Sequence, residues 1–343
     1  MTKRTRYFVM GSVGFLAIGL TVGLAAFYGG IPSFAEPAGP SELSYVPSDA
    51  AVVAYANVKD LMASQFRRQV RAINPTEQEE GQTELKNALG IDIERDIDYV
   101  VACMLASPTA TGTTAKNGYV IARGTFDRLR IEAFIREKGG IERQDQGRTI
   151  FVHPMHEGQA LSDGTATGTT EEMAVTFVDQ NVIALGTSVA LQKVIDLQLG
   201  SGANVLTNGD LMKLIEGVES GNAWVVGRFD AISKEAHLPT EVQGQLPQLT
   251  WFSATGHVNG GVSGTISAEA RDEEAATNLR QVVAGFIALA KMQAAAKPEL
   301  NAIVQSITLN NDSGNTVSVS FSVQSSVLDL IARTAGAAHQ QPK

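Results

Sequence analysis

Cysteine is almost absent from this sequence, because Cys103 is the single cysteine among 343 residues. A lone cysteine excludes an internal disulfide, so the fold has to be stabilised without one. Cys103 lies in the apolar run of residues 99–104, where a small hydrophobic side chain is expected to be buried. No basic residue adjoins it in the sequence to lower the thiol pKa, which favours a structural role over a reactive one.

The sequence also lacks the local motifs of nucleophilic and nucleotide-dependent catalysis. Residues 261–265 and 186–190 come nearest to a nucleophile elbow, but the first range lacks the second glycine and lies on an expected strand. In the second range Ala190 replaces the final glycine, and Ser188 stands where a helix cap belongs. No phosphate-cradling loop, dinucleotide fingerprint or calcium loop is present in the expected body. We therefore assign no catalytic residue and expect no cofactor.

One local cluster of metal-capable side chains occurs, formed by His153, His156 and Glu157. A helical zinc pair has histidines four residues apart with a glutamate between them. Here the two histidines are three residues apart and Pro154 between them disfavours a helix. The cluster is therefore interpreted as the polar end of a strand rather than as a metal site. We predict no bound metal. His257 lies on an expected strand, where a hydrogen-bonded sheet residue is favoured over a general base.

Negative charge predominates, with a formal net charge of −9 and only 18% charged residues. Lys3, Arg4 and Arg6 precede the first acidic residue, Glu36, so the chain beyond them is more acidic than the whole. An acidic body repels phosphate groups, which argues against nucleic acid as a partner and against a body lying flat on anionic lipid. The acidic segment 76–80 is interpreted as a solvated helix start rather than a pair of catalytic carboxylates.

One long apolar run, residues 7–28, follows the basic residues. As a helix it would be roughly 33 Å long, enough to cross a hydrocarbon core of about 30 Å. The preceding positive charges predict a cytoplasmic amino terminus. We therefore expect residues 1–35 to form a cytoplasmic basic tail and transmembrane anchor. The protein would then be a single-pass inner-membrane protein with its body in the periplasm or cell exterior.

Two other interpretations of residues 1–35 stay open. Residues 33–35 (Ser-Phe-Ala) could serve as the cleavage site of a signal peptide, although the apolar run exceeds the usual signal core of about 7–15 residues. A buried soluble helix is the remaining interpretation. Residues 36–45 are then a linker rich in small residues and proline at their start.

Hydrophobic periodicity predicts an α+β body with mainly antiparallel sheet and helices packed on one face of the sheet. The expected strands are residues 51–57, 98–105, 118–124, 149–153, 173–178, 181–185, 223–229, 250–258, 262–270, 303–309 and 316–323. The expected helices are a short one from Lys59 and residues 127–138, 188–198, 272–296 and 325–334.

The longest expected helix, residues 272–296, has a clear apolar pattern. Leu279, Val282, Val283, Phe286 and Leu289 recur at a spacing of three to four and are expected to face the core. Pro298 is expected to end this helix.

The order of elements repeats, which predicts two similar modules, residues 46–205 and 206–335, followed by a disordered tail at 336–343. In both modules a strand is followed directly by a short helix. Val58 aligns with residue 229 and Leu61 with residue 232, and both pairs are 171 residues apart in the sequence. The hexapeptide Thr-Ala-Thr-Gly-Thr-Thr occurs at 109–114 and again at 165–170. Small hydroxyl residues bury little area, so we expect both copies to be flexible surface loops.

Residues 46–55, followed by Val58 and Leu61, resemble the start of uncharacterised bacterial membrane-anchored proteins with an exported α+β body. Residues 264–289, a strand followed by a long alanine-rich helix, are similar to the later half of such proteins. The resemblance implies no known activity and no functional residues.

The sequence therefore favours a membrane-tethered, extracytoplasmic binding or interaction module that is not an enzyme. Its partners would be the membrane, through the amino-terminal helix, and a protein or an apolar ligand, with nucleic acid excluded. The alternatives are a cell-envelope hydrolase whose site is assembled from residues distant in sequence, and a purely structural envelope protein.

Overall fold

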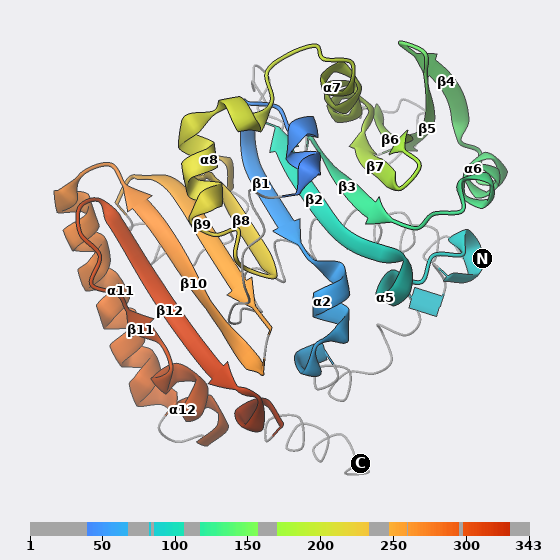
Figure 1. Ribbon diagram of the computed structural model, residues 1–343. Helices are drawn as coiled ribbons and strands as arrows, with labels where there is room; N and C mark the ends of the chain where they lie inside the picture. The colour runs from blue at the N-terminus through green and yellow to red at the C-terminus, as the bar shows by residue number, and fades with distance from the viewer. Residues whose placement is uncertain are drawn as a thin grey trace, which may run out of the picture.

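The computed structural model describes residues 40–67, 82–83, 86–105, 117–156, 170–232, 247–258, 260–294 and 298–329. Within these ranges the chain is α+β, and its strands form one twelve-stranded sheet in which neighbouring strands are antiparallel (Figure 1). The predicted fold class and antiparallel sheet are therefore confirmed. The predicted anchor, residues 7–28, lies outside the described residues. No helix in the described ranges is both long and apolar enough to cross a bilayer.

Two strands at the centre of the sheet, β1 (Ala50–Ala56) and β8 (Ala223–Arg228), pair with each other and join its two halves. Outward from β1, the first half continues with β2 (Ile97–Leu105), β3 (Gly118–Gly124), β7 (Val182–Thr187), β6 (Thr170–Asp179), β5 (Arg148–His156) and β4 (Ile141–Asp145). Outward from β8, the second half continues with β9 (Leu249–His257), β10 (Gly261–Ala270), β12 (Thr316–Gln324) and β11 (Thr308–Leu309). Each half thus places three successive strands side by side and then continues in reverse order, with four strands in the first half and two in the second.

Successive side chains of a strand point to opposite faces of the sheet. We call the face that carries Val53 and Trp224 the front face, and the face that carries Val52 and Val225 the back face. The front face is covered by η1 (Ser41–Tyr45), α7 (Ser188–Gln198), η2 (Val205–Thr207) and α8 (Gly209–Glu216). The back face is covered by α2 (Val58–Ala63), α5 (Ile93–Asp96), α6 (Arg128–Glu137), α9 (Phe229–Ile232) and α11 (Glu273–Ala294).

Helices therefore pack on both faces of the sheet, whereas the sequence predicts one. The central strands explain the difference, because consecutive residues such as Val52 and Val53 are both buried, one on each face. Burying apolar area on both sides of a strand requires a cover on each side. The continuous apolar run of β1, without polar alternation, is the sign of this arrangement in the sequence.

The expected linker at 36–45 is shorter than predicted, because Ser41–Tyr45 form the 3-10 helix η1 against the front face. Leu43 is buried in the main core together with Val46, Val53 and Leu191. Leu43 and the buried ion pair of Glu42, described below, attach this short segment to the body.

The long helix α11 begins and ends close to the predicted positions, but its apolar pattern divides between core and solvent. Leu279 is 4% exposed and Val283 packs beside it, whereas Phe286 is 43% and Leu289 49% exposed. The prediction that Phe286 and Leu289 face the core is thus wrong. Leu279 and Val283 meet β10 and β12, and the later turns of α11 extend beyond this contact.

The expected strand at 303–309 is divided between two elements, because residues 303–305 are helical and only residues 308–309 form a strand. Pro298 begins α12 (Pro298–Gln305) instead of only ending the preceding helix, and β11 retains two residues. Proline suits the first turn of a helix because its missing N–H would be unpaired there. The described chain ends in a helical turn at 325–329, at the start of the predicted last helix, and its remaining residues lie outside the described ranges.

Candidate functional site

The most deeply buried charge in the described chain belongs to Glu42 of η1, which is 1% exposed. Arg123 of β3 donates a hydrogen bond from Nε to Glu42 Oε1 at 2.5 Å. The hydroxyl of Tyr99 on β2 donates to Glu42 Oε2, also at 2.5 Å. Both carboxylate oxygens therefore have a donor, as a buried carboxylate requires.

An aromatic cluster continues from this ion pair across the centre of the sheet. The ring of Tyr55 lies 5.7 Å from that of Tyr99 and 5.6 Å from that of Trp224. Burial raises the pKa of Tyr99 to about 12, with a contribution from its hydrogen bond to Glu42, and burial also raises the pKa of Tyr55. Both phenols are therefore protonated at neutral pH. The cluster attaches η1 to the sheet and offers no group that could exchange a proton there.

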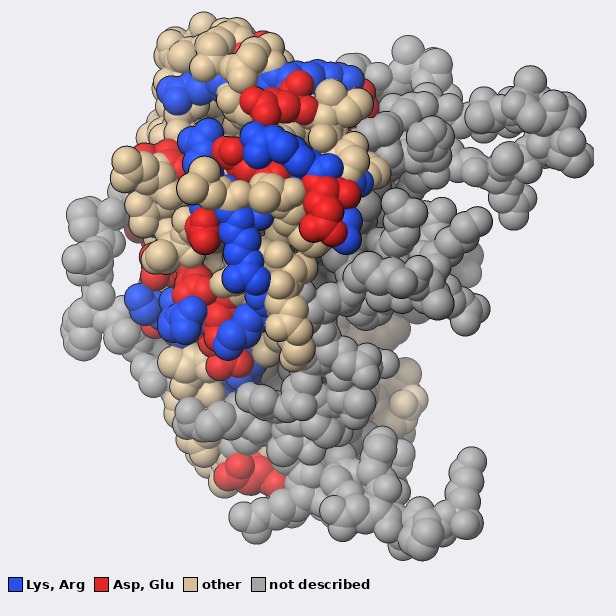
Figure 2. Space-filling view, turned by 90° about the vertical axis from the view of Figure 1, so that its right-hand side faces the viewer, with Lys and Arg blue, Asp and Glu red and all other residues tan. Residues whose placement is uncertain are grey.

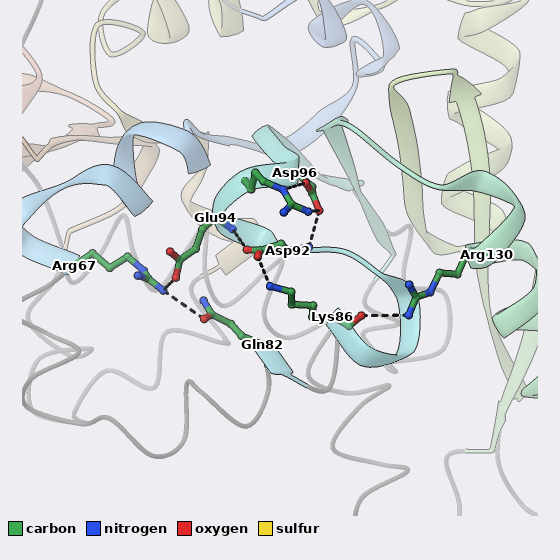
Figure 3. Close-up of polar contacts among 8 residues, drawn as sticks. Arg67, Gln82, Lys86, Asp92, Glu94, Asp96 and Arg130 are labelled. Carbon is green, nitrogen blue, oxygen red and sulfur yellow. Dashed lines mark hydrogen bonds and ion pairs between the residues drawn. The ribbon is translucent and has the colours of Figure 1, made fainter.

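A second polar cluster surrounds α5 on the back of the molecule (Figure 3). Lys86 Nζ lies 2.7 Å from Asp92 Oδ2, Arg67 pairs with Glu94, and Asp96 accepts a hydrogen bond from the backbone N–H of Asp92 at 2.8 Å. The hydrogen bond from Lys86 is the main cause of a lowered pKa of Asp92. The hydrogen bond from Arg95 likewise lowers the pKa of Asp96, so Asp92 and Asp96 are ionised and paired. The cluster therefore stabilises the start of β2 and does not resemble a general acid.

Opposite charges also alternate on the side of the molecule formed by α6 and β4, where Figure 2 shows Lys and Arg intermixed with Asp and Glu. Arg128 lies 2.6 Å from Glu132, Glu132 lies 3.2 Å from Arg136, and Arg136 lies 2.9 Å from Glu142. Chains of alternating charge leave little net field to attract a charged partner. This surface is therefore a solvated face rather than a binding site.

The front face of the second half of the sheet is different, because its side chains are hydroxyls. Thr255 of β9 lies opposite Trp224 and so belongs to the front face. The strand register places further hydroxyls on the same face: Ser253, Ser263, Thr265, Ser267, Thr316, Ser318, Ser320 and Ser322. We call this set with Thr255 the hydroxyl face. In the first half, α7 covers the corresponding front of β3, β6 and β7 with apolar side chains.

The hydroxyl face is partly open in the described structure: Thr316 and Ser322 are exposed and Thr265 and Ser320 half-buried, whereas Ser253, Ser263 and Ser318 are buried. In Figure 1, α8 lies close to β8 and β9, and no helix is drawn over most of β10 and β12. Hydroxyls on small side chains cannot bury the apolar area that would hold a helix in place, so this composition suits an uncovered face.

A hydrogen-bond network positions the hydroxyls at the centre of this face. The hydroxyl oxygens of Thr265 and Ser320 lie 2.8 Å apart across β10 and β12. Asn310 donates from Nδ2 to the Oγ atoms of Ser318 and Ser320, both at 2.8 Å. Ser318 in turn donates to Asp312 Oδ2 at 2.7 Å. The network fixes the orientation of these side chains before any ligand arrives.

Two shallow hollows, each of about 340 Å³, lie on the hydroxyl face. The first, which we call the His257 hollow, is lined by residues that include His257, Ser263, Thr308, Ser320 and Phe321. The second, the Trp251 hollow, is bordered by α8, and its lining includes Lys213, Trp251, Thr255, Ser267 and Glu269. Thr265 lines both hollows, so they are neighbours on this face, and we call the two together the trough.

Two residues that the sequence gave no reason to combine meet in the His257 hollow. His257 and Ser263, from the expected strand and from the elbow-like range 261–265, are direct partners across β9 and β10. Burial lowers the pKa of His257, partly offset by a hydrogen bond with the backbone of Ser220, so the ring is neutral at pH 7. Its buried Nδ1 atom has no hydrogen-bond partner in the described part of the chain.

The other residues considered from the sequence occupy separate places. His153 lies on β5 opposite Met173, and Glu157 lies outside the described residues. The described residues contain no group of three side chains that could hold a metal ion. Thr187, rather than Ser188, caps α7, because its side chain accepts a hydrogen bond from the N–H of Ala190.

Cys103 is buried in the front-face core, as predicted. Burial raises the pKa of its thiol to about 12, so the thiolate is not populated at neutral pH. This agrees with a structural role.

Comparison of the chain with protein-family models, with curated proteins and with solved structures found no match. Any function proposed for this chain therefore depends on its own residues and geometry.

Proposed function

We propose that this protein is a membrane-tethered, extracytoplasmic binding module and that the hydroxyl face is its ligand-binding surface. The apolar run at 7–28, preceded by Lys3, Arg4 and Arg6, supports the tether and the export of the body. The observation that carries the binding role is the trough on the hydroxyl face, where hydrogen bonds order the polar side chains and Thr265 and Ser320 stay partly accessible. Convergent polar groups in a hollow are typical of a binding site.

We also propose that the body arose from two similar modules, residues 46–205 and 206–335. The first three strands on either side of the β1–β8 pair follow the same order, β1-β2-β3 and β8-β9-β10, which supports this. So do the short helices that follow the two central strands, since α2 begins at Val58 and α9 at Phe229, the aligned positions. In this proposal the first module has a covered front face, and the second keeps the equivalent face for ligand.

A cell-envelope hydrolase is the second candidate, and the cross-strand pair of His257 and Ser263 favours it. A neutral histidine with an unpartnered ring nitrogen next to a serine hydroxyl is the minimum of a nucleophile–base pair. No hydrogen bond joins these two side chains in the described structure, and a binding role needs none. The binding module is therefore the function that these residues support better.

The tether is tested by protease accessibility in spheroplasts of cells that express the full chain with a tag at the amino terminus. We expect protease added outside to degrade the body and to leave the tag and residues 7–28 protected. A body protected until the membrane is lysed would contradict the proposed topology.

The binding surface is tested by affinity capture from native membranes with two matched variants of the full chain. Thr265→Arg fills the trough, and Thr277→Arg places the same side chain at an exposed position on α11, on the other face. We expect Thr265→Arg to lose the captured components and Thr277→Arg to retain them. Equal capture by both variants would exclude the hydroxyl face as the binding surface.

The hydrolase alternative is tested in parallel with Ser263→Ala. Loss of turnover of a cell-envelope substrate in this variant, with capture unchanged, would favour the enzyme.

A further inference from the structure

The lining of the trough disfavours a strongly charged ligand. Apart from His257, Lys213 and Glu269 are the charged residues that line it, and both border the Trp251 hollow. A strongly charged ligand would leave water for a site with almost no compensating charge. A ligand without polar groups would leave lining hydroxyls such as that of Ser267 without a hydrogen-bond partner.

The same lining favours a neutral ligand that carries many hydroxyl groups of its own. Each serine or threonine hydroxyl can donate one hydrogen bond and accept others, so it can pair with either end of a ligand hydroxyl. On neighbouring strands these groups are about 4.8 Å apart, which places several within reach of one ligand. Trp251 adds aromatic surface to the lining of the Trp251 hollow, against which the C–H groups of such a ligand can pack.

We propose that the trough binds a neutral oligosaccharide, with consecutive sugar units in the His257 hollow and the Trp251 hollow. This inference deepens the proposed function and depends on the hydroxyl face being the binding surface. Because Thr265 lines both hollows, a chain of sugars fits the trough better than a single sugar does. The hydrogen bond between Thr265 and Ser320 places the central hydroxyls where both units can reach them.

The experiment uses the full chain in lipid nanodiscs and isothermal titration with soluble hexasaccharides: the neutral cellohexaose, maltohexaose and chitohexaose, and a hexamer of galacturonic acid as the charged comparison. We expect at least one neutral hexamer to bind and the charged hexamer to bind more weakly. Thr265→Val keeps the shape of the side chain and removes the hydroxyl, and Ser320→Ala removes its partner. Each is expected to weaken binding about three- to tenfold, as loss of one hydrogen bond predicts. Thr277→Val on α11 is the matched control and should bind as the wild type does.

Three results would overturn the inference: no binding of any neutral hexamer, equal binding by wild type and both trough variants, or preferred binding of the charged hexamer. These results are separable from failure of the proposed function. If membrane capture still depends on Thr265 while saccharides do not bind, the face binds another class of ligand. If capture does not depend on Thr265 either, the proposed binding surface itself is wrong.

Discussion

Arg123 and Glu42 form an ion pair across 81 residues of sequence, with Nε of the arginine 2.5 Å from Oε1 of the glutamate. Because Glu42 is 1% exposed, removing the arginine leaves a carboxylate in the protein interior without its counter-charge. Loss of one partner of a buried pair costs about 3–5 kcal/mol. Since the guanidinium of Arg123 is partly exposed, we expect Arg123→Met to lower the free energy of unfolding by about 3 kcal/mol.

Urea unfolding followed by circular dichroism measures this effect. Arg143→Met is the matched control, because Arg143 pairs with Glu172 at an exposed edge of the sheet. There we expect less than about 1 kcal/mol. Similar losses for the two variants would mean that η1 is not held by its buried ion pair.

Two leucines of α11 make a second comparison within one helix. Leu279 is buried between α11 and the sheet, whereas Leu289 is 49% exposed. We expect Leu279→Ala to cost about 2–5 kcal/mol through lost burial and a cavity. Leu289→Ala should change stability by about 0.5 kcal/mol or less. Thermal or urea unfolding of both variants measures the difference, and a large loss for Leu289→Ala would place that side chain in a core.

The lowered pKa of His257 predicts a pH dependence of stability. A histidine with a lower pKa in the folded state binds a proton more readily once the chain unfolds. Its contribution is therefore constant above the ordinary pKa of about 6.5, and stability is lost as the pH falls below that value. The cause of the shift is burial. We expect the stability difference between wild type and His257→Gln to change between pH 8 and pH 5.5, in the direction that favours the variant in acid. Parallel stability curves over this range would contradict the prediction.

The buried thiol of Cys103 predicts slow modification of the native protein. Its pKa of about 12 leaves almost no thiolate at pH 8, and the thiolate is the reactive form. We expect Ellman's reagent to label the protein only as urea unfolds it, with the same midpoint as the loss of circular dichroism. Rapid stoichiometric labelling without urea would show that the thiol is accessible and reactive.

Most of the local elements follow from the sequence, because their signals are local. The expected strand at 118–124 and the expected helix at 188–198 coincide with β3 and α7. In each element the apolar residues recur with the period of a strand or a helix, and the flanking residues are of types that end the element. By contrast, the apolar residues in 298–305 are compatible with either a strand or a helix. The chain forms a helix there, and Pro298 suits its first turn.

The arrangement of the elements was harder to predict, because it depends on pairs that are distant in sequence. The β1–β8 pair brings Tyr55 opposite Trp224, and no local pattern indicates that contact. The ion pair of Glu42 is similar, since its partners Tyr99 and Arg123 lie on two other elements. Long-range pairing is also why the single sheet could not be read from the apparent repeat.

Half of the candidate site could have been found in the sequence. Thr316, Ser318, Ser320 and Ser322 alternate with apolar residues along β12, which indicates a strand with one hydroxyl face. What the alternation cannot supply is the register that sets Thr265 beside Ser320. That register places the hydroxyls of neighbouring strands side by side, and the trough lies between them.

The two edge strands of the sheet, β11 and β4, limit how copies of this protein can associate. β11 has only two residues, and β4 presents Glu142, Arg143 and Asp145 along a short exposed edge. Unpaired edges of this kind resist the addition of a strand from a neighbouring chain, because one is too short and the other is charged. Copies crowded together at high density can therefore remain separate, without merging their sheets into fibres.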